Sequence, residues 1–126
     1  MPIASSLLNK PRLVEKLRNF YSYVQKNDGK VGIKTRGIDL NFNNACNLRC
    51  KYCFTNSPKG DHVKEYLDLS AIKKLADEAD QLEYFEFDLQ GGELLLQPEK
   101  LFSVLEAIRP ERFYLYLTTN GFHLDQ

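Results

Sequence analysis

The sequence lacks several features that would place it outside the ordinary globular proteins. No apolar stretch approaches the ~20 residues of a membrane-spanning helix, and the first ten residues lack the basic and apolar regions of a secretory signal. Basic and acidic residues balance at 17 each, so no net charge favours nucleic acid as an obligatory partner. A hydrophobic fraction of 43% suits the core of one domain of 126 residues. We therefore expect a cytoplasmic protein that needs neither a membrane nor nucleic acid.

Cysteine is scarce, and its three copies are clustered. Cys46, Cys50 and Cys53 form a C-x3-C-x2-C pattern within eight consecutive residues. An odd, clustered set argues against a disulfide framework and indicates a metal or cluster site. Three thiolates leave one iron of a [4Fe–4S] cube without a protein ligand, and such an iron can bind a small molecule.

Two other interpretations of the cysteines stay open. The three thiols could bind zinc together with His62 or His123, since the spacing of Cys46 and Cys50 is tolerable for zinc. They could also be buried and inert, although inert thiols have no reason to cluster. The metal content of the purified protein separates these interpretations.

Hydrophobic periodicity predicts a helix followed by alternating strands and helices. Pro11 opens the first helix and Pro110 ends the last, while Asp68 or Ser70 is the expected N-cap of the middle one. The predicted helices are 11–24, 69–82 and 97–109, and the predicted strands are 31–35, 38–42, 84–89 and 113–118. The alternation indicates an α/β fold in which βα units form a parallel sheet.

Three loops that carry distinctive residues each follow a predicted strand. They are the cysteine loop, Gly91-Gly92-Glu93 and Thr119-Asn120-Gly121. The carboxyl ends of parallel strands lie at one edge of a sheet or barrel, so the three loops should meet there. The aromatic residues of the strands, including Tyr114 and Tyr116, are expected in the core. The charged residues 73–80 are expected to form a solvated helix face.

The cysteine motif, with an aromatic residue before its last cysteine, resembles the signature of radical S-adenosylmethionine (SAM) enzymes. The resemblance implies that Cys46, Cys50 and Cys53 bind three irons of a [4Fe–4S] cluster, while the amino and carboxylate groups of SAM chelate the fourth. It places Tyr52 near the adenine of SAM.

The other two loops also resemble segments of this family. Gly91-Gly92-Glu93 resembles its GGE motif, which contacts the amino group of SAM. Thr119 and Asn120 resemble a segment after the third barrel strand and are expected near SAM or the substrate. Taken alone, a Gly-Gly-Glu or Asn-Gly sequence is also typical of a plain turn.

The resemblance implies an enzyme that cleaves SAM reductively to a 5′-deoxyadenosyl radical, which abstracts hydrogen from a substrate. An external flavodoxin or ferredoxin supplies the electron. The substrate is expected to be a peptide or a small metabolite, because the resemblance is closest to members that often carry extra C-terminal clusters. No further cysteine is present to bind such a cluster here.

The resemblance covers only the first half of the family's core. We expect residues 1–36 to be an N-terminal helical extension that caps the bottom of the barrel. Residues 37–126 are expected to supply the first three strands of a radical SAM partial TIM-like barrel. The missing C-terminal half would come from a longer chain, or otherwise from a partner chain or a second copy. The alternative function is a non-catalytic module that binds an iron–sulfur cluster or zinc and completes its fold with a partner chain.

Overall fold

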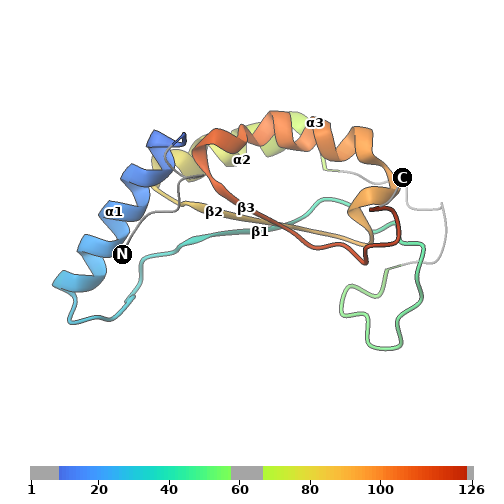
Figure 1. Cartoon of the computed structure of the whole chain (residues 1–126), viewed down its shortest axis with the longest axis horizontal. Coiled ribbons are helices and arrows are strands. Elements are labelled where there is room, and N and C mark those ends of the chain that lie inside the picture. The colour runs from blue at the N-terminus through green and yellow to red at the C-terminus, as the bar shows by residue number, and fades with distance from the viewer. Residues whose placement is uncertain (1–8, 58–66, 125–126) are drawn as a thin grey trace.

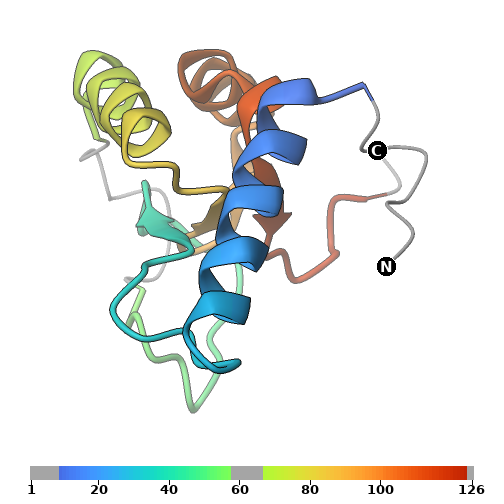
Figure 2. The ribbon, with the colours of Figure 1, turned by 90° about the vertical axis from the view of Figure 1, so that its left-hand side faces the viewer.

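Three parallel strands form one sheet, with the strand order β1-β2-β3, in a computed structural model that describes residues 9–57 and 67–124. The strands are β1 (Gly37–Asn41), β2 (Glu86–Gln90) and β3 (Tyr114–Leu117), and the helices between them are α2 (Leu69–Gln81) and α3 (Pro98–Ile108). Both helices lie on the same face of the sheet (Figures 1 and 2). This confirms the predicted α/β fold, and consecutive parallel strands with helices on one face are the building plan of a TIM-like barrel.

The remaining elements are one long helix and two short 3₁₀ helices. Helix α1 (Pro11–Lys26) precedes the sheet, while η2 (Leu94–Leu96) and η3 (Pro110–Arg112) flank α3. Asp68 caps α2, because its side chain accepts a hydrogen bond from the backbone N–H of Ser70. No helix in the described part of the chain is long and apolar enough to cross a bilayer.

The core lies between the sheet and helices α2 and α3. Alternate residues of β2, Phe87 and Leu89, point toward the helices and are fully buried. The ring of Phe87 meets that of Phe113 edge to face, with 4.7 Å between the ring centres. The helices contribute Ile72, Ala76, Ala79, Leu101, Val104 and Ile108 to the same cluster.

Two predictions about the strands are wrong. Residues 31–35 form a turn-containing connection in place of a strand, and the side chain of Ile33 is 97% exposed, because no neighbouring strand pairs with this segment. Tyr114 and Tyr116 lie outside the core, since the two-residue period of β3 turns them away from the helices. Their rings instead contact each other, with 4.8 Å between the ring centres.

The face of the sheet opposite the helices is polar. The parallel register places Asp39 of β1 beside Asp88 of β2, and Asn41 beside Gln90. Gln90 donates a hydrogen bond to Asp88 over 2.8 Å. Like charges on neighbouring strands destabilise a sheet unless other groups compensate them, so this face is unsuited to an apolar covering.

Helix α1 covers the end of the sheet at which the strands begin (Figure 1). The Lys16 side chain is fully buried, and its ammonium donates to the backbone oxygens of Tyr84 (3.0 Å) and Arg112 (2.9 Å), just before β2 and β3. Lys10 donates in the same way to Pro110 and Phe113. This is the position that the capping interpretation of the helix predicts.

Charged residues of α2 join this contact with α1. Asp80 lies 2.6 Å from the Lys16 ammonium and 3.0 Å from Arg12, and Asp77 lies 2.8 Å from Arg112. Burial opposes ionisation of Asp80, but the hydrogen bonds from Lys16 and Arg12 outweigh it and hold the pKa of Asp80 below its ordinary value. The prediction of a solvated helix face is therefore wrong for Asp77 and Asp80, which bind α1 and η3.

Candidate functional site

The three distinctive loops meet at the end of the sheet opposite α1. The cysteine loop follows β1, Gly91-Gly92-Glu93 follows β2 and Thr119-Asn120-Gly121 follows β3. They lie at the right of Figure 1, where the strands end. The backbone N–H of Glu93 donates to the Ala45 oxygen over 2.7 Å, which ties the second loop to the first. Together with the hydrogen bonds from Thr119 and Asn120 to the Glu93 side chain, this contact confirms the predicted meeting of the loops.

The cysteine loop is irregular and holds its thiols near the surface. Cys50 and Cys53 are exposed, Cys46 is half-buried, and none of the three forms a disulfide. Two local hydrogen bonds shape the loop: Cys53 N–H donates to the Cys50 oxygen (3.3 Å), and Leu48 N–H donates to Cys46 Sγ (3.4 Å). The Tyr52 ring is 91% exposed beside these thiols, where a ligand could stack on it.

One of the thiols is readily ionised. The Thr55 hydroxyl lies 3.2 Å from Cys53 Sγ, and hydrogen bonds from Thr55 and the backbone of Ser57 lower the pKa of this thiol to about 7. The thiolate is the form of cysteine that binds iron or zinc. A large fraction of Cys53 is thus present as the thiolate at neutral pH.

The donor set fits an iron–sulfur cluster, although the thiols are not gathered. Within residues 9–57 and 67–124, no three His, Cys, Asp or Glu side chains are close enough to hold a metal ion. His123 therefore joins no such group, and His62 lies outside the described residues. Three free thiols on one irregular loop are nevertheless the chemistry that a [4Fe–4S] cluster requires, and metal binding commonly orders such a loop.

Glu93 joins the second loop to the third. Its side chain is fully buried, and one carboxylate oxygen accepts hydrogen bonds from Leu95 N–H (2.8 Å) and the Thr119 hydroxyl (2.7 Å). The other oxygen accepts from Asn120 N–H over 2.7 Å. A buried polar side chain must find its hydrogen-bond partners within the protein. The structure therefore places Glu93, Thr119 and Asn120 together as one hydrogen-bonded unit.

The two glycines allow the first and second loops to touch. Gly92 N–H lies 3.1 Å from the backbone oxygen of Asn43 and 3.2 Å from its side-chain oxygen. A Cβ atom at Gly92 would overlap the backbone carbonyl of Ala45 and lie 2.7 Å from the Asn44 oxygen. Glycine is thus required here for contact between two backbones, whatever the loop also binds.

We expect Gly92→Ala to destabilise the fold by about 2 kcal/mol, within the range for overpacking at a tightly packed site. The added methyl group must push the cysteine loop away from Glu93, because backbone atoms cannot rotate aside as a side chain can. Urea unfolding of the two proteins measures the difference. Gly29→Ala is the control, since a Cβ there meets no atom within 4 Å and carries only the strain of a positive φ. Equal stability of Gly92→Ala and the parent chain would contradict the close contact.

Sequence reasoning missed two asparagines of this site. Asn43 is buried and holds Gly92. Asn47 accepts a hydrogen bond from the Asn120 side chain over 2.8 Å, which links the first loop to the third. For Asn43 the available signal was a short polar side chain directly after a predicted strand, and for Asn47 it was a place inside the cysteine motif.

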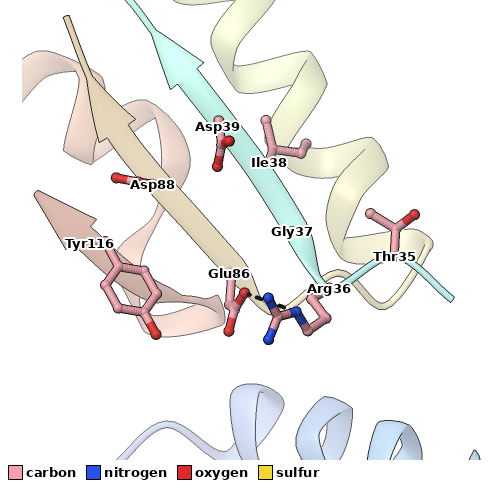
Figure 3. A pocket seen from close by; sticks show the side chains of 8 residues that line it. All are labelled: Thr35, Arg36, Gly37, Ile38, Asp39, Glu86, Asp88 and Tyr116. Atoms are coloured by element: carbon pink, nitrogen blue, oxygen red, sulfur yellow. Dashed lines mark ion pairs between the residues drawn. The ribbon is translucent and has the colours of Figure 1, made fainter. Parts of the chain in front are cut away.

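A separate hollow lies on the open face of the sheet, toward the start of the strands. Its volume is about 410 Å³, and Asp39, Glu86, Asp88 and Tyr116 are among the residues that line it. Figure 3 shows Arg36 turned toward Glu86 at its lower end, with 3.8 Å between their charged atoms. This hollow is lined by early strand residues, whereas the cysteines and Glu93 follow the strand ends, so it is not part of the loop site.

Comparison with known proteins gives one family match. The family described as the Radical SAM superfamily matches residues 40–126. That span contains the end of β1, strands β2 and β3, helices α2 and α3, and all three loops of the site. Helix α1 lies outside the matched span.

Curated proteins give further matches to this chain. An S-adenosylmethionine-dependent nucleotide dehydratase of Fibrobacter sp. is 29% identical over 75% of this chain and 30% of its own length. GTP 3′,8-cyclase of Yersinia pestis is 31% identical over 69% of this chain and 27% of its own length. The chain thus spans about a third of the length of the curated relatives that it matches.

Proposed function

Because this chain belongs to the radical SAM superfamily of enzymes, we propose that it is the cofactor-binding part of an enzyme that cleaves SAM reductively. The convergence of the three loops at the carboxyl ends of the strands carries this proposal. In parallel α/β folds, sites form at this end because the loops there are free to vary over a rigid sheet.

Cys46, Cys50 and Cys53 would hold the [4Fe–4S] cluster. When bound, the cluster supplies one electron to the sulfonium of SAM, which breaks a carbon–sulfur bond and gives methionine and a 5′-deoxyadenosyl radical that takes hydrogen from a substrate. The irregular loop suits this role because its exposed thiols can move toward shared irons. The lowered pKa of Cys53 supports thiolate formation at neutral pH.

The other two loops would place SAM on this cluster. Gly91 and Gly92 let this loop lie directly against the cysteine loop, and Glu93 fixes the loop that would contact the amino group of SAM. Tyr52 offers an exposed ring for the adenine. Thr119 and Asn120 complete the rim next to SAM or substrate, held there by Glu93.

The partners follow from the same proposal. A protein of the flavodoxin or ferredoxin type would supply the electron, and three free thiols suit a reducing compartment such as the cytoplasm. For the substrate we propose a small metabolite before a peptide, with nucleotides tested first, because two of the relatives act on nucleotides by name. Further strands beyond β3 would complete the barrel.

One observation favours the alternative of a metal-binding module that a partner chain completes. Leu117, Phe122 and Leu124 are exposed at and beyond the end of β3, where apolar groups favour contact with another segment. Such a module would bind iron–sulfur or zinc without cleaving SAM. Both functions place the metal on the same three cysteines, so metal identity and SAM turnover together separate them.

The test is anaerobic reconstitution of the 126-residue chain with iron and sulfide, then reduction in the presence of SAM. We expect a brown protein with equal iron and sulfide, an electron paramagnetic resonance signal that SAM alters, and 5′-deoxyadenosine as a product. A cluster that leaves SAM intact would favour the module. Stoichiometric zinc after anaerobic purification, with no uptake of iron and sulfide, would contradict the proposal.

A further inference from the structure

A series of three hydrogen bonds, joined covalently within Asn120 and between Asn47 and Leu48, runs from the buried Glu93 carboxylate to a cysteine sulfur. Glu93 accepts from Asn120 N–H (2.7 Å), and the Asn120 side-chain amide donates to Asn47 Oδ1 (2.8 Å). Asn47 directly follows Cys46, and the next residue, Leu48, donates its N–H to Cys46 Sγ (3.4 Å). Hydrogen bonds thus connect the loops that follow all three strands to the Cys46 thiol.

The series has a fixed origin. Glu93 is fully buried, so its carboxylate cannot exchange protein donors for water. Its two oxygens accept three hydrogen bonds from Leu95, Thr119 and Asn120. Because a buried side chain depends on these partners alone, Glu93 holds the backbone at Asn120 in place.

The Asn120 side chain is also fixed in its orientation. Its oxygen accepts from Phe122 N–H over 3.0 Å, which turns the amide nitrogen toward Asn47. Both ends of the amide group are therefore used, and the amide cannot flip without losing both bonds. Asn120 thus joins the third loop to the residue after Cys46.

The last bond of the series bears on the chemistry of a cluster. Hydrogen bonds to ligand sulfurs are among the factors that set the reduction potential of an iron–sulfur cluster, because they stabilise the more negative, reduced form. Leu48 N–H is such a donor, and Asn47 sets the position of its peptide group.

We propose that Glu93 and Asn120 are positioning residues that hold Leu48 N–H against the Cys46 sulfur and so raise the reduction potential of the cluster. This inference rests on the proposed function, since it requires Cys46 to be a cluster ligand. It gives the Glu93 side chain a role through the protein, separate from any contact of its loop with SAM.

The test compares Asn120→Ala and Asn47→Ala with the parent chain in two states. In the cluster-free chain, we expect amide hydrogen exchange at Leu48 to rise roughly fivefold in both variants, as for loss of one supporting hydrogen bond. In the reconstituted chain, we expect both to shift the midpoint potential of the cluster to more negative values. The double variant should show the same shift in potential as either single variant, because both substitutions remove the same hydrogen bond, the one between Asn120 and Asn47.

The matched control is Asn19→Ala. Asn19 is also an exposed asparagine with a long-range side-chain bond, to Glu83 over 2.6 Å at the α1 end of the molecule. It should leave both the Leu48 exchange rate and the potential unchanged. Because Asn47 is exposed and lies outside the Glu93 unit, its variant should fold even if Asn120→Ala does not.

The results separate two claims: that the hydrogen bonds hold Leu48 N–H in place, and that this raises the reduction potential of the cluster. Unchanged exchange at Leu48 in both variants would overturn the hydrogen-bond series, whether or not a cluster binds. Faster exchange with an unchanged potential would overturn the effect on the cluster. A parent chain that exchanges as expected but takes up no cluster would instead contradict the proposed function, and with it this role of the series.

Discussion

The Cys50→Ala chain is expected to take up no stable [4Fe–4S] cluster, whereas the parent chain takes up one. Removal of Cys50 leaves two thiolates for a cube that needs three protein ligands when SAM supplies the fourth. Iron and sulfide content after anaerobic reconstitution, together with the brown absorbance, measures the difference. Without a cluster, the same variant should unfold at the same temperature as the parent, because the Cys50 side chain is exposed.

Lys51→Ala is the control for this experiment. Lys51 is the exposed neighbour of Cys50 on the same loop, and it has no atom that could ligate iron in its protonated form. It should load iron and sulfide as the parent does. Full loading of Cys50→Ala would remove this residue from the ligand set.

The Lys16→Met chain is expected to lose about 3 kcal/mol of unfolding free energy, because one partner of a buried ion pair is removed. The methionine keeps the apolar stem but leaves the oxygens of Tyr84 and Arg112 without their donor. It also removes the cation from above the Phe113 ring, 3.9 Å from the ring centre. Urea unfolding of the cluster-free chains measures the loss.

Lys26→Met is the matched control, since Lys26 lies in the last turn of the same helix and is exposed. Its loss should change stability by less than about 1 kcal/mol, the scale of a charge near a helix terminus. Equal effects of the two substitutions would show that Lys16 does not anchor α1 to the sheet.

The periodic elements could be predicted from the sequence because each carries its own pattern. The apolar residues of 69–82 recur at helical spacing, and the structure has a helix at Leu69–Gln81. The strands were predicted less accurately, since a short apolar run becomes a strand only when a neighbouring strand pairs with it. Residues 31–35 have no such neighbour, whereas Tyr114–Leu117 pairs with β2 and forms its strand.

Contacts between distant residues were beyond the sequence pattern. Lys16 lies between Leu13 and Phe20 on the apolar stripe of its helix, which was a signal that it is buried. Its partners, however, are 64 or more positions away. Likewise, the motif identified Glu93 as important, but only the fold shows that its carboxylate binds the third loop. Motifs predict where chemistry is concentrated, and topology determines which groups touch.

The neighbouring carboxylates on the open face of the sheet limit what can cover it. Asp39 and Asp88 are register partners, and within the described residues one oxygen of Asp88 is buried without a hydrogen-bond partner. An apolar layer packed on this face would remove the water around both carboxylates and leave their repulsion unscreened. Whatever segment or ligand lies over these strands must therefore bring ordered water, hydrogen-bond donors or positive charge with it.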